Sequence, residues 1–275
     1  FKQINTSQWD ISDIADIWLP NAYYDGDDNY WDMMTQNAAV QNYNVSIRGG
    51  SPKTSYYASI SYKDQDGIVK GSNSRNFGGR FNFESMASDK LKFGMNMDAS
   101  SRTANNKDNM ISTLINMRPD YPAYNEDGSI NTIDYYTKNP LIEWMDLNHS
   151  TSRNINASAF LEYNIFKFLK FRTTLNAQYG NVKSESFSRR SYDGANNSGS
   201  QRDAQNYTMV WDNLLTFYKT MRKHDVQAML GHSVEHVSSD YMSAGGTDYS
   251  DDDILTNLGS AANRTSMNST KTACS

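Results

Sequence analysis

A short acidic stretch near the beginning of the chain has side chains suited to a calcium ion. In DGDDNYW, Asp25, Asp27 and Asn29 stand at alternate positions, as the first ligands of a calcium-binding loop do. Such a loop also needs glycine where Tyr30 stands and glutamate where Gln36 stands. We therefore interpret this stretch as a solvated acidic loop.

Two stretches near the end of the chain could also be considered for metal binding. GHSVEH places His232 and His236 on one face of a strand, but a zinc protease motif needs a helix and a glutamate where Ser233 stands. We expect both histidines to be polar residues facing water inside the fold. The acidic run 251–253 has the character of an exposed loop. The sequence predicts no metal site and no cofactor.

Catalytic constellations are not apparent in the sequence. It has no glycine-rich phosphate loop, no nucleophile elbow and no plausible triad. The one cysteine, Cys274, provides neither a disulfide framework nor a cysteine-based metal site. We expect a protein that is not an enzyme.

Aromatic residues in the segment 102–151 could bind a ligand. Tyr121, Tyr124 and Trp144 occur there among several asparagines and aspartates. Binding surfaces for sugars combine aromatic rings, which stack on the sugar, with polar side chains for its hydroxyls. We predict that these three residues contact a ligand, with loop packing or contact with a partner protein as the alternative.

Composition restricts the class of protein. Only 37% of the 275 residues are hydrophobic, and the mean hydropathy is −0.75, so a large dry core would be thinly supplied. The net charge of −5 gives no basic surface for nucleic acid. No run reaches the roughly 20 apolar residues of a membrane-spanning helix.

Period-two alternation of apolar and polar residues recurs along the chain and predicts about eight strands. In the first of them Tyr43, Val45 and Ile47 share a face opposite Asn44, Ser46 and Arg48. Several strands approach the roughly 9 to 11 residues of a tilted strand that crosses a membrane. The runs cover residues 43–48, 56–63, 77–84, 91–98, 155–163, 171–179, 207–217 and 226–234.

The connections alternate in length. Very short turns alternate with long polar segments at 64–75, 102–151 and 180–204. A soluble sandwich has no reason for this alternation, whereas an outer-membrane barrel has short periplasmic turns and long extracellular loops. Aromatic residues also mark strand ends, as in the girdles of a barrel. They are Tyr43, Tyr56, Tyr62, Phe77, Tyr163, Tyr179, Tyr207 and Phe217.

These features predict part of an antiparallel transmembrane β-barrel. One strand face meets lipid and the other faces the lumen, which explains why so polar a chain can fold without a dry core. The residues predicted to face the lumen are Arg48, Lys63, Arg80, Lys92, Asn96 and Arg172.

Several stretches together resemble one family. QNYNVSIRGGSPKTSYYASISYKDQDGIVKGSNSRNFGGRFNFES, LKFGMNMDAS, KNPLI, FLEYNIFKFLKFRTTLNAQYG and TFYKTMRKHDVQAMLGHSVE resemble, in order, barrel strands of the SusC/RagA family. Its members are TonB-dependent outer-membrane transporters of Bacteroidetes-type bacteria. The resemblance runs from about residue 29 to about residue 258.

The resemblance implies a barrel of the 22-stranded, plugged type. We expect residues 1–40 to be a plug-to-barrel connecting or loop segment and residues 41–275 to be part of the barrel. The family implies import of oligosaccharides or peptides, with a SusD-like surface lipoprotein as partner. It also implies energy from a TonB–ExbB–ExbD complex, acting through an N-terminal plug and contact box that this sequence does not show.

Two other classes of protein remain open at this point. A soluble carbohydrate-binding or adhesive β-domain would pack its apolar faces against a second sheet, and a secreted β-rich hydrolase would need paired carboxylates in a cleft.

A slice of a barrel with two open edge strands would expose unpaired backbone groups. We therefore expect the 275-residue segment not to fold alone as a functional pore.

Overall fold

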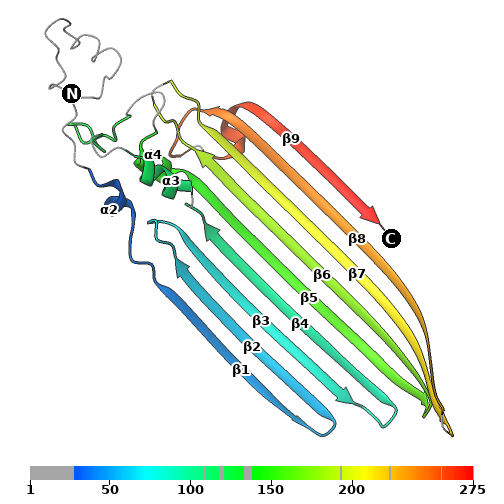
Figure 1. The fold of residues 1–275 in the computed structure, drawn as a ribbon. Helices are drawn as coiled ribbons and strands as arrows, with labels where there is room; N and C mark the ends of the chain where they lie inside the picture. The colour runs from blue at the N-terminus through cyan, green and yellow to red at the C-terminus, as the bar shows by residue number, and fades with distance from the viewer. Residues whose placement is uncertain are drawn as a thin grey trace, which may run out of the picture.

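The computed structural model describes residues 28–107, 109–117, 121–132, 138–192, 194–222, 224–254 and 256–274. They form one nine-stranded antiparallel sheet in which each strand pairs with the next strand in sequence (Figure 1). No helix in the described part of the chain is long and apolar enough to cross a membrane. The all-β antiparallel fold predicted from the sequence is confirmed.

The eight predicted strands are present, and a ninth was not anticipated. The strands are β1 (Val40–Ser51), β2 (Thr54–Asp66), β3 (Asn73–Met86), β4 (Leu91–Asn105), β5 (Leu147–Phe166), β6 (Leu169–Ser188), β7 (Ser198–Met221), β8 (His224–Tyr249) and β9 (Ala261–Cys274). A short 3-10 helix, η1 (Leu258–Ser260), precedes β9.

Several strands are longer than their alternation indicated. The segment 180–204 was predicted as a long loop, but β6 continues to Ser188 and β7 begins at Ser198, so most of it is strand. β8 likewise has 26 residues. These strand ends are mostly polar on both faces, and a strand without a continuous apolar face leaves little period-two signal.

The strand register divides the sheet into two faces. Residues directly opposite each other in neighbouring strands share a face, and the register joins Tyr43 to Tyr62 and Tyr62 to Phe77. Further along the sheet Tyr179 lies opposite Tyr207 on the same face. We call this the apolar face. It also carries Val45, Ile47, Ile60, Phe81, Phe93, Met95, Met97, Ile155, Leu161, Leu175, Met209, Trp211 and Leu230.

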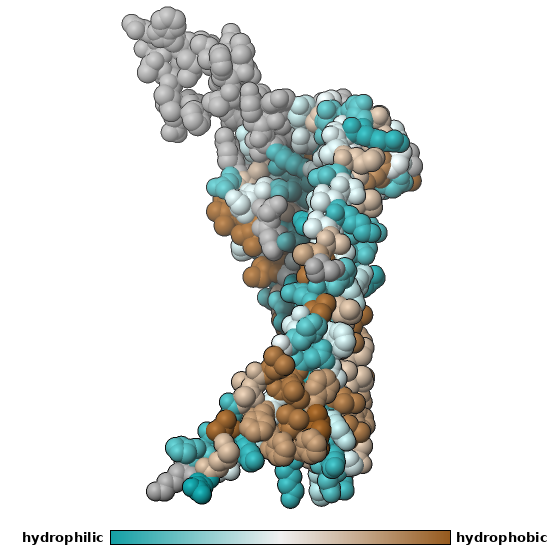
Figure 2. All heavy atoms as spheres, turned by 90° about the vertical axis from the view of Figure 1, so that its right-hand side faces the viewer, coloured by the Kyte–Doolittle hydropathy of each residue, from teal (hydrophilic) through white to brown (hydrophobic). Residues whose placement is uncertain are grey.

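The apolar face is open to its surroundings. Val45 is 75% exposed and Leu230 is 71% exposed, because no second sheet covers them in the described residues. The largest hydrophobic patch in Figure 2 lies toward the end of the sheet that holds the short turns. Hydrophilic residues dominate the opposite end. An uncovered apolar face of this extent needs an apolar environment.

The apolar face has the height of a membrane. In β6 it runs from Leu169 to Tyr179, ten steps of about 3.3 Å each, or about 33 Å of strand. A strand tilted by about 40° would then span about 25 Å, the height of the apolar band of outer-membrane barrels. Above this band the same face turns polar, with Arg153 and Asn181 opposite each other.

The main buried core of the described residues lies among the loops at the end of the sheet away from the short turns. Three short helices contribute to it: α2 (Tyr30–Met34), α3 (Asn109–Asn116) and α4 (Pro140–Met145). They lie together at the upper end of β1 to β5 (Figure 1). The core cluster consists of Tyr30, Met34, Val69, Met110, Leu114, Ala123 and Leu141. We call this unit the loop cluster.

Candidate functional site: a polar groove beneath the loop cluster

The long β4–β5 connection is ordered by one buried asparagine. Asn139 is fully buried and caps α4, since its side chain accepts a 2.9 Å hydrogen bond from the Leu141 amide. Its Nδ2 donates to the carbonyls of Ala123 and Asn131 at 3.0 and 2.9 Å. Pro140 follows at the first turn, where a missing amide hydrogen costs nothing. Asn139 thus fixes where α4 begins and to which loop it is attached.

Two cross-connections fix the far end of α4. Trp144 Nε1 donates a 2.7 Å hydrogen bond to the Lys70 carbonyl in the β2–β3 loop. Lys107 Nζ donates to the Trp144 carbonyl at 2.6 Å and also to the Asp146 carbonyl. Burial lowers the pKa of Lys107, and the nearby Asp146 carboxylate opposes part of that shift. The helix is therefore joined to both β4 and the β2–β3 loop.

Asp146 ties the loop cluster to the wall of the sheet. Its carboxylate accepts hydrogen bonds from Lys138 Nζ at 2.6 Å, from the Ser188 hydroxyl at 3.1 Å and from the Arg189 amide at 2.7 Å. The last two donors lie at and just beyond the end of β6. An ion pair with two further hydrogen-bond donors and limited exposure is stronger than an open surface pair.

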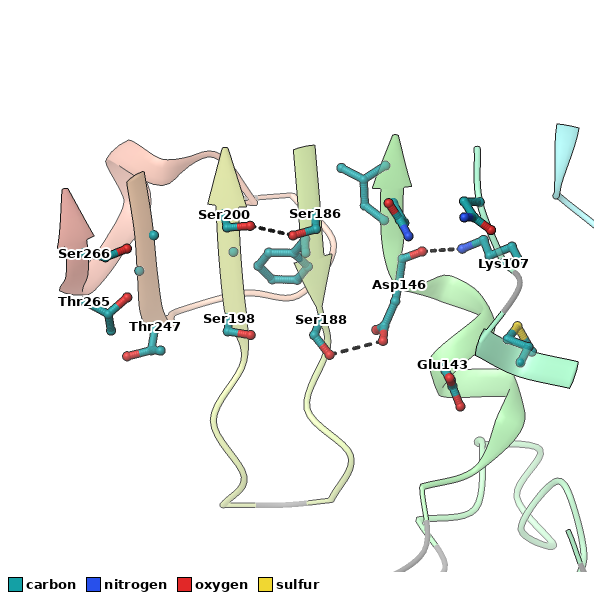
Figure 3. Close-up of a pocket in the computed structure, with 18 residues that line it drawn as sticks. Lys107, Glu143, Asp146, Ser186, Ser188, Ser198, Ser200, Thr247, Thr265 and Ser266 are labelled. Atoms are coloured by element: carbon teal, nitrogen blue, oxygen red, sulfur yellow. Dashed lines mark hydrogen bonds between the residues drawn. The ribbon is translucent and has the colours of Figure 1, made fainter. Parts of the chain in front are cut away.

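A groove of about 390 Å³ lies between α3, α4 and the upper parts of β5 to β9. Its sheet side is rich in hydroxyl groups, which Figure 3 shows on neighbouring strands across from Lys107, Glu143 and Asp146. The Ser186 and Ser200 hydroxyls are 2.7 Å apart. The wall hydroxyls are those of Ser186, Ser188, Ser198, Ser200, Thr247, Thr265 and Ser266. We call this the hydroxyl groove.

The hydroxyl groove belongs largely to the polar face of the sheet. Ser186 and Ser200 are opposite each other in the register and alternate with Phe187 and Gly199, which point to the apolar face. Glycines Gly199, Gly245 and Gly246 also line the groove, so a ligand could approach the backbone closely there. The groove offers many donors and acceptors with a lysine and two carboxylates at its rim. Such a surface suits a polar, hydroxyl- or amide-rich ligand.

A second hollow, of about 280 Å³, lies lower on the polar face of β4 to β7. It is lined by Asn96, Asp98, Asn156, Ser158, Asn176 and Gln178, among others. Asn156 Nδ2 donates a 2.9 Å hydrogen bond to Asp98. Amide and hydroxyl side chains therefore continue down the wall below the hydroxyl groove.

The six residues predicted to face the lumen all lie on the polar face. Arg48, Tyr57, Asn82 and Asn96 are aligned across β1 to β4, while Arg80, Lys63, Lys92 and Arg172 occupy other rows of that face. Arg172 lies 4.4 Å above the Phe160 ring and 3.7 Å from Glu162. That the polar face lines a lumen stays a prediction.

The three loop aromatics are not brought together. Tyr121 is buried, and its carbonyl accepts a hydrogen bond from the Tyr30 hydroxyl. Tyr124 is 48% exposed, and Trp144 is held by its bond to Lys70. None of the three lines the hydroxyl groove, so their contact with a ligand stays a prediction. Sequence reasoning missed Lys107, Asp146 and the serines, whose types are too common to stand out.

The candidate metal-binding stretches have other surroundings. His232 and His236 lie on the apolar face, opposite Asn213 and Met209, so their expected water-facing position was wrong. The alternation of β8 puts both on the side of Val234. Asn29 caps α2. Asp25 and Asp27 lie outside the described residues.

The acidic run after β8 serves as an anchor. Asp252 pairs with Arg190 at 3.1 Å, and Asp253 pairs with Arg189 at 2.5 Å. These contacts join the β8–β9 loop to the β6–β7 loop. Within the described ranges, no group of three or more histidine, cysteine, aspartate or glutamate residues could hold a metal ion.

Comparison with known proteins gives a consistent result. No protein-family model matches the chain. The chain is 30% identical over 238 residues to TonB-dependent receptor P26 of Formosa agariphila, covering 80% of this chain and 23% of that protein. It is 24% identical to TonB-dependent receptor P3 of the same organism, over 79% of this chain and 23% of that protein.

Solved structures match the fold over most of the sheet. The RagAB peptide transporter superposes with a TM-score of 0.72 at 21% identity, covering 90% of this chain and 30% of that chain. The chain is thus similar to part of a TonB-dependent receptor, in agreement with its resemblance to the SusC/RagA family. The RagAB peptide importer in its open-open state matches with a TM-score of 0.71 at 20% identity, over 98% of this chain and 33% of that chain.

The matches cover only part of each relative. The chain spans about a quarter of the length of the curated relatives that it matches. Its open nine-stranded sheet is accordingly a segment of a TonB-dependent receptor barrel in the outer membrane. These relatives are receptors and transporters rather than enzymes.

Proposed function

We propose that this segment forms part of the wall of a receptor that imports oligosaccharides or peptides across the outer membrane. The observation that carries the proposal is the division of one sheet into an exposed apolar face about 25 Å high and a continuous polar face. Lipid would cover the first face, and substrate would pass along the second.

The hydroxyl groove is the proposed contact for the substrate at the outer end of the wall. It lies at the end of the sheet with the long loops, which in outer-membrane barrels face the outside of the cell. Its hydroxyls and carboxylates can form hydrogen bonds with sugar hydroxyls and with peptide groups alike. The amide-lined hollow around Asn156 would form the next contact inward.

Partners are proposed from the family. A SusD-like surface lipoprotein would cover the loop end, and a TonB–ExbB–ExbD complex would supply energy through N-terminal parts of the receptor. The name of one similar structure, the RagAB peptide transporter, supports peptides as one substrate class. We also propose that residues 1–40 connect plug to barrel and that residues 41–275 belong to the barrel wall.

The soluble binding domain is disfavoured by the uncovered apolar face. In such a domain Phe81, Phe93 and Leu161 would pack against a second sheet. Each of them is instead exposed on a single-layered sheet. A hydrolase would need a carboxylate pair in a cleft, and Glu143 and Asp146 at the rim of the groove are engaged by Thr113 and Lys138.

The test uses the complete receptor that contains this segment. We expect it to fractionate with outer membranes, to migrate as a heat-modifiable barrel and to co-purify with a lipoprotein. Uptake of radiolabelled oligosaccharides or peptides should stop when TonB is deleted. A soluble, monomeric product that binds glycans would contradict the proposal and favour the binding-domain alternative.

A further inference from the structure

The polar face of the first four strands has an unbalanced charge. Across β1 to β4 this face carries five cations and two carboxylates, Glu84 and Asp98. The apolar face of the same strands carries Arg75, Asp64 and Asp66, an excess of one negative charge. The whole chain has a net charge of −5. Positive charge is therefore concentrated on one face of a protein that is otherwise acidic. The five cations are Arg48, Lys63, Arg80, Lys92 and Arg102.

Among the described residues, four of these cations lie in no ion pair, and three of the four also make no side-chain hydrogen bond. Lys92 pairs with Glu84 at 2.8 Å, and Arg102 donates to the Ser74 hydroxyl at 2.9 Å. Arg48, Lys63 and Arg80, by contrast, are exposed and lie in no ion pair among the described residues. Asp98 is directly opposite Arg80 in the register, but its carboxylate accepts a hydrogen bond from Asn156 instead.

The three unpaired cations form a line along the wall. Arg80 lies two strands from Arg48 and one row nearer the loops, a separation of about 12 Å. Lys63 lies one strand from Arg80 and four residues further toward the loops, at about 14 Å. We call these three residues the cationic track. Between them the face carries Ser59, Ser61 and Asn76.

Within a narrow lumen this arrangement would have a strong effect on charged solutes. Cations lining a passage with low-dielectric walls raise the local concentration of anions and speed their entry. Spacings of 12 to 14 Å match repeated charges on an extended oligomer rather than one compact anion. Uncovered arginine and lysine side chains can bind carboxylates without first breaking an existing ion pair.

We propose that the cationic track binds an anionic linear oligomer, one that bears repeated carboxylate groups, as it moves along the wall. This inference rests on the proposed transport function and specifies the substrate class. An oligosaccharide of acidic sugars and an acidic peptide both supply the required chemistry. A contact with an acidic surface of the receptor's own plug is the competing explanation.

The test measures binding to the purified, complete receptor at low salt. The probes are an oligogalacturonate, an oligoglutamate of similar length and a neutral dextrin. The track variant combines Arg48→Gln, Lys63→Gln and Arg80→Gln. The control variant combines Arg75→Gln, Arg153→Gln and Lys183→Gln, which removes the same charge from the apolar face above the membrane band.

We expect the wild-type receptor to bind at least one of the two acidic probes more tightly than dextrin. The track variant should bind that probe about tenfold more weakly and with less dependence on salt, while the control variant should bind it normally. The acidic probe that binds identifies the source of the carboxylates.

Three outcomes would overturn the inference. They are failure of the wild type to bind either acidic probe, unchanged acidic-probe binding in a folded track variant, and loss of heat-modifiable migration in that variant. The last would show that the cations are needed for the barrel to fold rather than for binding of a substrate. If the inference about the cationic track fails, TonB-dependent uptake of any probe, including dextrin, would still support the proposed transport function.

Discussion

The indole nitrogen of Trp144 and the carbonyl of Lys70 are joined by a 2.7 Å hydrogen bond between positions 74 residues apart. The bond connects α4 in the β4–β5 connection to the β2–β3 loop. Lys70 is itself held on α2, since its Nζ donates to the Met33 carbonyl at 2.6 Å. Three segments distant in sequence thus meet at one point of the loop cluster, and α3 and α4 of this cluster contribute to the hydroxyl groove.

Replacing Trp144 by phenylalanine should loosen the loop cluster without changing the barrel. The substitution removes one hydrogen bond, worth about 1 kcal/mol, and leaves the ring packing largely intact. Limited proteolysis of the complete receptor should then cut segment 106–146 several times faster. Tyr124→Phe, at an exposed ring whose hydroxyl makes no hydrogen bond to the described residues, is the matched control. Equal cleavage rates in both variants would contradict the role of the Trp144 hydrogen bond in holding the loop cluster together.

A substitution of Tyr124 tests whether its ring contacts a ligand or only packs within the loop. Its ring is 48% exposed and lies outside the hydroxyl groove, so Tyr124→Ala should leave folding unchanged. If the ring stacks on substrate, uptake should fall by about fivefold, since stacking on an aromatic ring contributes about 1 kcal/mol. Uptake assays with oligosaccharides and peptides check this, and wild-type uptake would remove Tyr124 as a ligand contact.

Adjacent residues of β4 provide a test of which face meets lipid. Met97 lies on the apolar face and Asn96 on the polar face. Met97→Arg should destabilise the barrel by about 2 to 4 kcal/mol, because the charge would enter the bilayer. Asn96→Arg should change stability by about 0.5 kcal/mol or less. Urea unfolding of the receptor in lipid vesicles measures both, and equal effects would refute the assigned sidedness.

Burial of Lys107 predicts a dependence of stability on pH. Its lowered pKa means that the unfolded chain binds its proton more tightly than the folded protein does. The contribution of Lys107 to stability should therefore rise with pH from the lowered pKa up to the usual value of about 10.4.

In Lys107→Met this part of the rise should disappear. The measurement is the free energy of unfolding in urea at several pH values between 8 and 10.5. Lys53→Met, in the exposed β1–β2 turn, serves as the control for removing a lysine. A rise that is the same in wild type and Lys107→Met would contradict the role of burial.

A buried asparagine should hold the β6–β7 loop against the end of β8. Asn197 is fully buried, accepts a 2.7 Å hydrogen bond from the Tyr249 amide and donates a 3.0 Å bond to the Tyr249 carbonyl. Asn197→Ala removes the partner of the Tyr249 amide, while the Tyr249 carbonyl keeps its bond from Arg190, and should cost about 1 to 3 kcal/mol. Asn196→Ala, at the exposed neighbour, should cost less than about 0.5 kcal/mol. Thermal unfolding of the complete receptor compares them.

Sequence alone determined the wall of the sheet. Alternation is a local property, because residues two apart in a strand share a face. The common face of Tyr43, Val45 and Ile47 can therefore be predicted without information about the rest of the fold. The same reasoning placed Arg48 and Arg80 together on the polar face. The resemblance then supplied the family, because it rests on a series of such strands in order.

Tertiary structure decided what the polar segments do. β9 and the outer ends of β6 to β8 have no apolar face, so pairing with a neighbour rather than composition makes them strands. The hydroxyl groove depends on Asn139, Lys107 and Asp146, whose partners are mostly carbonyls and hydroxyls from other segments. Such contacts leave no periodic pattern in the sequence, because the donor and the acceptor lie in segments that come together only in the folded chain.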